Sequence, residues 1–257
     1  MNTGMNHLVK YLSLSVMALI GFCSCQKPFN VNTGSIKLTI INKVKGSPLV
    51  LNTQTYTNPF GETYSVSKFK YYISNVSLSG PGESVIENNS YHLVDEAIPA
   101  SQVFHFETTP NTFSNLQFVL GVDSARNVSG AQTDALDPLN DMFWTWNSGY
   151  VMAKMEGNSP QSNQAGGKIE YHIGGFKGSS SVLKTINLNL PAGKLVNIKA
   201  GQVSEITIEA DLDSWWRSPN DIKIADLPVC TTPGPLAKNV ADNYSKMFTI
   251  TDVRNNK

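Results

Sequence analysis

The sequence predicts an all-β protein, a single antiparallel β-sandwich of the immunoglobulin or cupredoxin kind with a short C-terminal helix. About ten short segments alternate apolar and polar residues with a period of two, and no long segment has the helical period of 3.6. Turn-forming stretches such as "SGPGES" and "PAGK" separate these segments. Charged residues make up only 16 % of the chain, which suits a secreted β-rich protein.

The strand pattern is clearest in residues 34–46, because Ile36, Leu38 and Ile40 fall on one face. Residues 65–80 also alternate apolar and polar side chains, with a break in the alternation that indicates a bulge. The other expected strands are 90–96, 111–124, 149–158, 167–178, 183–191, 194–201, 204–216 and 248–253.

Two segments favour helix instead. The first is "NDMFWTWNSG", residues 140–149, which follows Asp137-Pro138, a good helix start. The second lies in "TPGPLAKNVADNYSKMFTI", residues 232–250, where apolar residues recur at helical spacing: Leu236, Val240, Tyr244 and Met247. We expect one C-terminal helix followed by a closing strand.

The N-terminus predicts a lipoprotein signal peptide. Lys10 precedes an apolar run from Tyr11 to Phe22, which is shorter than the about 20 residues of a membrane span and matches a signal h-region. The run ends in "FCSCQK", where Ser24-Cys25 looks like a bacterial lipobox. We expect a signal peptide over 1–24, a tether over 25–34 that begins at a diacylated Cys25, and one domain over 35–257. Its acyl chains would hold the protein on a membrane stably.

Composition and motifs exclude several classes of function. The 20 basic and 20 acidic residues balance, so no basic excess favours nucleic acid. The chain has no G-x-S-x-G, no HExxH and no phosphate loop, and we expect no enzymatic activity. With Cys23 removed and Cys25 lipidated, Cys230 has no disulfide partner, and we expect it to be a small buried apolar residue.

Histidines are the first candidate metal ligands. After processing, His92, His105 and His172 remain. His172 stands at a strand end before two glycines, where another chain can approach closely. Three histidines can form a copper or zinc site, but each is also compatible with a hydrogen-bonded structural role.

The run "FWTWNSG" is the second candidate. Trp144 and Trp146 would share one face of a strand, where core packing is the ordinary role of a large aromatic residue. Their flanks are polar and rich in turn residues, however, and crowd side-chain oxygens beside the indoles: Asp137, Asn140, Asp141 and Asn147. Both a core role and a functional role stay open on spacing alone.

The stretches "LGVDS", "WTWNSGY" and "YHIGG", with the terminal "LAKNVADNYSKMFTITDV", resemble the MbnP-like copper-binding family over about residues 35–255. The resemblance implies an extracytoplasmic β-sandwich that binds copper through histidine. It also implies a tryptophan near the metal that a MauG-like dihaem partner, related to cytochrome c peroxidases, oxidises to kynurenine.

Carried over to this chain, the resemblance implies His172 as a copper ligand and one of Trp144 and Trp146 as the modified residue. Well-studied members carry a further histidine around the tryptophan segment, where this chain has "LDPLNDMFW". We therefore include Asp141 and His105 among the candidate metal residues, with His92 as the alternative source of a second imidazole. A site with one imidazole and oxygen ligands would be weaker and could favour a different metal.

The lipobox predicts a lipoprotein of the outer membrane of a Gram-negative bacterium, facing the periplasm or the cell surface, and the family resemblance implies that it binds copper. The alternative is a surface lipoprotein whose sandwich is an interaction or glycan-binding module without metal. That alternative expects exposed, flat tryptophans.

Overall fold

The computed structural model describes residues 32–130, 132–144 and 149–255, and three β-sheets form the framework of this part of the chain. The first sheet has the order β17 (Phe248–Asn255), β15 (Val203–Asp211), β1 (Gly34–Val44), β2 (Ser47–Pro48), and β7 (Val103–Thr108) also pairs with β1. We call it the five-stranded sheet.

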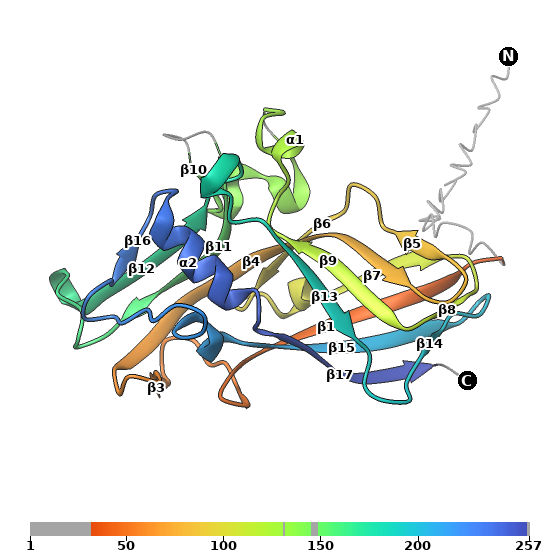
Figure 1. Ribbon diagram of the computed structural model, residues 1–257, viewed down its shortest axis with the longest axis horizontal. Helices are drawn as coiled ribbons and strands as arrows, with labels where there is room; N and C mark the ends of the chain where they lie inside the picture. Colours follow the sequence, from red (N-terminus) through yellow and green to blue (C-terminus); the bar gives the residue numbers. More distant parts are fainter. Residues whose placement is uncertain (1–31, 131, 145–148, 256–257) are drawn as a thin grey trace, which may run out of the picture.

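The second sheet, the ten-stranded sheet, is built around the long strand β4 (Thr63–Ser79) (Figure 1). Its order is β13 (Lys184–Asn189), β9 (Asn115–Leu120), β4, β11 (Gly149–Asn158), β12 (Lys168–Gly174), β16 (Val229–Cys230). The strands β3 (Thr55–Thr57), β5 (Ser84–Ile86) and β6 (Tyr91–Asp95) also pair with β4, and β10 (Phe143–Trp144) pairs with β11. A third sheet joins β8 (Thr112–Phe113) to β14 (Val196–Asn197).

Helices are short. The described residues form two α-helices, α1 (Ser124–Asn127) and α2 (Pro235–Tyr244). Their 3-10 turns are η1 (Pro99–Gln102), η2 (Asp134–Leu136), η3 (Pro138–Asn140), η4 (Ala165–Gly167), η5 (Gly178–Ser180) and η6 (Leu212–Trp215). The helix α2 buries Val240 and Tyr244 and packs against β12 and η6. In the part of the chain that the structure describes, no helix has the length and apolarity to cross a membrane.

The five-stranded and ten-stranded sheets share one core. Phe248 of β17 contacts Phe118 of β9 and Tyr71 of β4, with ring centroids 5.0 Å and 5.7 Å apart. Trp215 of η6 extends this contact to Phe69, at 5.8 Å. Buried aromatic pairs in tilted or edge-to-face geometry stabilise such an interface beyond the area that they bury.

The mostly β prediction with a C-terminal helix and closing strand is confirmed by α2 and β17. The prediction of a single antiparallel sandwich is wrong in detail, because the sheets are several and mixed: β1 pairs with β15, and β12 with β16, in parallel. A period of two reveals a strand and its buried face, but it carries no information on the direction of the neighbouring strand.

The prediction of a helix over 140–149 is also wrong for its described residues. The side chain of Asp137 accepts a hydrogen bond from Leu139 N and caps only the single turn η3. Asp141 then adopts the left-handed conformation, with φ 62°, and ends the turn. The chain continues as β10, because pairing with β11 satisfies its backbone groups.

Candidate functional site

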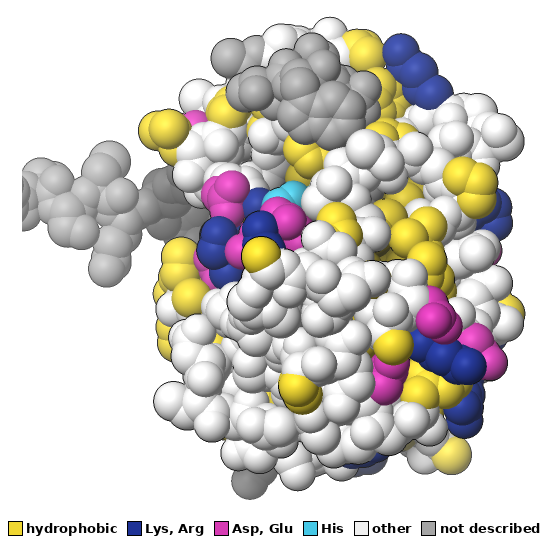
Figure 2. Space-filling model, turned by 90° about the vertical axis from the view of Figure 1, so that its left-hand side faces the viewer, with side chains coloured by type: hydrophobic (Ala, Val, Ile, Leu, Met, Phe, Trp, Pro, Cys, Tyr) yellow, Lys and Arg dark blue, Asp and Glu magenta, His cyan; other side chains and the backbone are white. Residues whose placement is uncertain are grey.

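Two rows of charged side chains lie on the outer face of β4, β11 and β12. Cross-strand register places Lys70, Lys154 and His172 side by side in one row, and Lys68, Glu156 and Glu170 in the next. Their neighbours along the strands, such as Phe69 and Tyr171, point into the core. Figure 2 looks onto the end of the molecule that lies on the left in Figure 1, near β12 and β16, and shows a histidine among acidic and basic side chains.

His172 lies between the two glutamates. Its Nε2 is 2.8 Å from Glu156 Oε1 and 3.4 Å from Glu170 Oε1. One possible ligand atom from each of the three residues lies within 4.8 Å of the others. We call these three residues the His172 cluster. All three side chains are partly buried, so water competes only in part for their charges.

The remaining carboxylate oxygens of the cluster bind lysines. Glu156 Oε2 is 3.3 Å from Lys68 Nζ, and Glu170 Oε2 is 2.7 Å from Lys168 Nζ. Each glutamate therefore turns one oxygen towards the imidazole and the other towards an ammonium group. This arrangement neutralises the glutamates without using the oxygens that face His172.

Burial lowers the pKa of His172 below its ordinary value and outweighs the hydrogen bond with Glu156, which raises it. Burial alone would raise the pKa of Glu156, but the hydrogen bond from His172 and the charge of Lys68 lower it overall. At neutral pH the imidazole of His172 is thus uncharged and the carboxylate of Glu156 is ionised, the protonation states that metal ligands require.

Trp144 lies on the same outer face as His172. Successive side chains of β12 alternate between faces, so Gly174 faces the same side as His172. The ring of Trp144 occupies the space over Gly174: a Cβ added there would be 2.5 Å from Cζ3 and 2.6 Å from Cη2. The structure therefore brings the Trp144 indole to a position two residues along β12 from His172.

The indole of Trp144 is 6 % exposed and also borders a cavity of ≈ 300 Å³. The cavity is lined by Tyr150, Phe176, Lys177 and Pro233 among others. Trp146 lies outside the described residues, as do Cys23 and Cys25 of the expected lipobox.

Asp141 turns to lysines rather than to His172. Its Oδ2 is 3.0 Å from Lys68 Nζ and 3.0 Å from Lys154 Nζ, and its backbone carbonyl also accepts a hydrogen bond from Lys154 Nζ. Burial would raise the pKa of Asp141, but the hydrogen bonds from both lysines lower it overall. In this arrangement Asp141 ties the tryptophan segment to β4 and β11.

The other two histidines that the structure describes lie away from the His172 cluster. His105 is exposed on β7, opposite Lys37 of β1 in the five-stranded sheet, so the structure does not bring it to His172. His92 Nε2 is 3.0 Å from Glu87 Oε2, and its ring stacks on Phe104 with centroids 3.9 Å apart. Cys230 is buried, as expected, and burial raises the pKa of its thiol to about 11.

Glu156 and Glu170 are the residues that the sequence reasoning missed. Glu170 stands two residues before His172 in a predicted strand, so the period of two places both on one face. Glu156 becomes adjacent only through the register of β11 with β12. The available signal was the pair Lys154 and Glu156 within the apolar strand 149–158, because charged groups in such a strand need partners.

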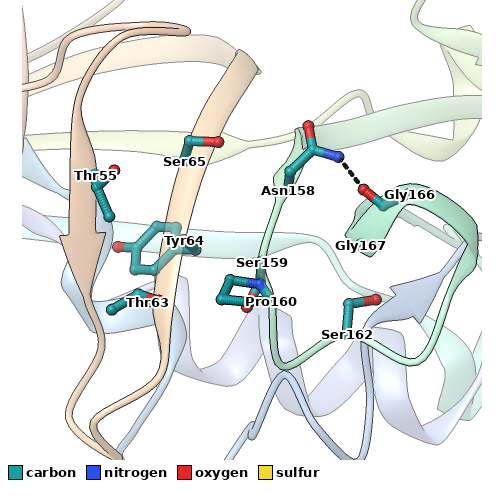
Figure 3. A pocket seen from close by; sticks show the side chains of 10 residues that line it. All are labelled: Thr55, Thr63, Tyr64, Ser65, Asn158, Ser159, Pro160, Ser162, Gly166 and Gly167. Carbon is teal, nitrogen blue, oxygen red and sulfur yellow. Dashed lines mark hydrogen bonds between the residues drawn. The ribbon is translucent and has the colours of Figure 1, made fainter.

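A separate hollow of ≈ 480 Å³ lies between the β3–β4 hairpin and the turn after β11 (Figure 3). Hydroxyl side chains dominate its lining, among them Thr55, Thr63 and Ser162, and Asn158 Nδ2 donates to Gly166 O at 2.9 Å. Its lining contains no histidine, carboxylate or cysteine, so it offers neither metal ligands nor a nucleophile paired with a base.

Comparison with known proteins gives one structural likeness and one family match. No curated protein matches the chain. Among solved structures, MbnP from Methylosinus trichosporium matches with a TM-score of 0.48 and 12 % identity, over 79 % of this chain and 83 % of that chain. The MbnP family model matches residues 33–232, more than half of the sequence. The chain therefore belongs to the MbnP family.

Proposed function

We propose that this protein is an extracytoplasmic, lipid-anchored metal-binding protein without enzymatic activity, and that its metal is copper. The observation that carries the proposal is the His172 cluster, in which one imidazole and two carboxylates converge. Its position beside Trp144 and the chain's membership of the MbnP family support the proposal.

The donor set fits a divalent ion. Imidazole and carboxylate suit Cu²⁺ and Zn²⁺, whereas Cu⁺ favours sulfur ligands, which the cluster lacks. Bonds of about 2.0–2.2 Å place neighbouring ligand atoms roughly 3 Å apart, and Nε2 lies 2.8 Å and 3.4 Å from the two carboxylate oxygens. His172 and the two Oε1 atoms would hold the ion, while Lys68 and Lys168 keep their pairs with the Oε2 atoms.

Trp144 is the tryptophan that we propose as the target of oxidation to kynurenine by a MauG-like dihaem partner. Its indole lies on the same face as His172, so a modified ring there would border the metal. The glycan-binding alternative expects exposed tryptophans, and the 6 % exposure of Trp144 counts against it. We propose that the anchor is a diacylated Cys25 in the outer membrane.

Titration of the purified mature protein with Cu²⁺ and with Zn²⁺ in a calorimeter tests the metal proposal. We expect one site per chain, and we expect His172→Ala to weaken it by more than about a hundredfold, since even the loss of an outer-shell contact costs about 10–100-fold. Glu156→Gln should weaken it as well. The matched control is His105→Ala, which removes an exposed imidazole from the five-stranded sheet and should leave affinity unchanged.

Full Cu²⁺ and Zn²⁺ affinity in His172→Ala would reject the ligand assignment, and no stoichiometric metal in the wild type would reject the function. Mass spectrometry of the peptide containing Trp144, after co-expression with the dihaem enzyme, tests the modification separately. An unmodified Trp144 would remove the oxidation step from the proposal and leave the metal site standing.

A further inference from the structure

Residues 134–141, with the sequence "DALDPLND", form a projection on the outer side of the ten-stranded sheet, which we call the aspartate knob. It consists of η2 and η3 and leads directly into β10. Leu139 at its tip is 91 % exposed, more than any other large apolar residue that the structure describes. Single exposed apolar residues are common and need no explanation by themselves. The backbone contacts and the charges around Leu139 therefore carry the argument for a function.

The sheet holds the backbone of the knob rigidly. Tyr72 Oη donates to Ala135 O at 3.0 Å, and Tyr150 Oη donates to Leu136 O at 2.7 Å. Lysines hold the second half: Lys70 Nζ donates to Asn140 O at 3.3 Å, and Lys154 Nζ donates to Asp141 O. Four carbonyls of this eight-residue segment are thus bound by side chains from β4 and β11.

Hydrogen bonds within the knob fix its tip. Asp137 Oδ1 accepts from Leu139 N at 2.9 Å, and Asn140 Nδ2 donates to Asp134 O at 2.8 Å. The knob therefore presents the apolar side chain of Leu139 on a backbone whose conformation is fixed before any partner binds. Such preorganisation lowers the entropic cost of binding a partner.

The surroundings of Leu139 are acidic and partly apolar. A hollow of ≈ 380 Å³ lies beside it, with Ile98 at its rim and Asp95, Asp134 and Asp141 among its lining residues. Ile98 is 53 % exposed. Between Asn127 and Ala153 the sequence has three aspartates and no lysine or arginine. Asp95 is paired with Lys70 at 3.0 Å, and Asp141 is paired with Lys68 and Lys154. The negative charge that remains at this surface is therefore that of Asp134 and Asp137, and the cation beside them is Arg126, which lines an adjoining hollow with Asp134.

We propose that the aspartate knob and Ile98 are the docking surface for a partner protein that presents an apolar socket edged with lysine or arginine side chains. Leu139 would fill the socket as the buried anchor, and the aspartates would steer the basic rim into place. Because η3 contacts β10, a partner docked here lies beside Trp144. The inference rests on the proposed function in one respect, the identity of that partner as the dihaem enzyme.

The test measures binding of the purified dihaem enzyme to the mature protein by surface plasmon resonance at several salt concentrations. We expect Leu139→Asp to weaken binding by at least about tenfold. Asp134→Asn combined with Asp137→Asn should slow association and flatten its salt dependence. Leu195→Asp is the control: Leu195 is also exposed, at 43 %, and adjoins β14 at the opposite end of the molecule from β10 (Figure 1).

Equal affinity of wild type and Leu139→Asp, or no binding of the enzyme to the wild type, would overturn the docking surface. Circular dichroism and Cu²⁺ titration of Leu139→Asp should match the wild type, because Leu139 contributes neither to the core nor to the His172 cluster. If the protein binds the enzyme through Leu139 but binds no metal, the docking surface is supported and the metal proposal is rejected.

Discussion

At the scale of single residues, Gly174 determines where the indole of Trp144 lies. The two ring atoms nearest to the site of a Cβ at residue 174 are 2.5 Å and 2.6 Å from it, and Tyr150 O is 2.9 Å from it. A side chain at residue 174 would displace the indole from the face that carries His172. Residue 174 is therefore glycine because an aromatic ring approaches it closely, and not because its backbone adopts the left-handed conformation.

Gly174→Ala is therefore expected to destabilise the fold by about 1–3 kcal/mol, the usual cost of inserting atoms into a packed site. Urea unfolding measures the change, and tryptophan fluorescence of the native state reports whether the indole has moved. Gly82→Ala is the control, because an added Cβ there meets only Asn111 Oδ1, at 3.9 Å. A native Gly174→Ala protein with wild-type stability would contradict the packing described here.

Among the residues of the candidate site, the sequence alone identifies some and misses others. The motifs identified Trp144 and His172, and the structure brings them to one face. Glu156 escaped because its distance from His172 depends on the register of two strands that are joined by a turn of uncertain length in the sequence. Asp141 was expected near the metal, but the competing attraction of Lys68 and Lys154 depends on three-dimensional proximity that spacing does not encode.

At the scale of elements, Asp141 connects the aspartate knob to the strands beneath it. Its carboxylate accepts from lysines of β4 and β11, and Lys154, whose side chain is 3 % exposed, also binds its carbonyl. A buried ammonium group is stabilising only while it is paired. The position of η3 and β10 on the sheet therefore depends on these contacts.

Acid should loosen this connection. The folded-state pKa of Asp141 is lowered from its ordinary value of 3.8, so its contribution to stability is complete above that value and is lost as pH falls through the folded pKa. Asp141→Asn should make stability less dependent on pH below about pH 4, as measured by urea midpoints between about pH 2 and 6. Because the side chain is 55 % exposed, solvent screening keeps the effect small.

The control for Asp141→Asn is Asp221→Asn, whose side chain is 64 % exposed and whose contact is a single ion pair with Arg217 at 3.6 Å. It should leave the pH profile as in the wild type. Identical profiles for Asp141→Asn and wild type would show that the carboxylate does not hold the knob.

The sequence predicts a strand correctly where one face of that strand is buried, but it does not predict which strands pair with one another. The alternation in 34–46 and 204–216 predicts β1 and β15, yet their parallel pairing brings together segments more than 150 residues apart. The helix expected after Asp137-Pro138 had a valid start signal, but the backbone partners offered by β11 outweigh that local preference. Local sequence patterns thus predict most strands and helices, whereas contacts between segments far apart in the sequence determine how these are arranged.

At the scale of the whole molecule, Phe248 joins the two large sheets. It belongs to the five-stranded sheet, is 5 % exposed, and makes ring contacts with Phe118 and Tyr71 of the ten-stranded sheet. Because no disulfide is present among the described residues, packing of this kind holds the sheets together. The His172 cluster lies on the opposite face of the ten-stranded sheet from this core, so the core positions the site without contributing to it.

Phe248→Ala should destabilise the protein by about 3–5 kcal/mol, the usual cost of removing a buried phenylalanine ring. Unfolding should remain a single transition, because both sheets contribute to one core and neither buries its inner face alone. Far-ultraviolet circular dichroism and tryptophan fluorescence, followed in the same urea titration, should therefore coincide. Leu195→Ala, on the exposed surface, should change stability by no more than about 0.5 kcal/mol. Separate transitions for the two signals would mean that the sheets unfold independently, and the rigid platform on which the His172 cluster and the aspartate knob depend would then be the ten-stranded sheet alone.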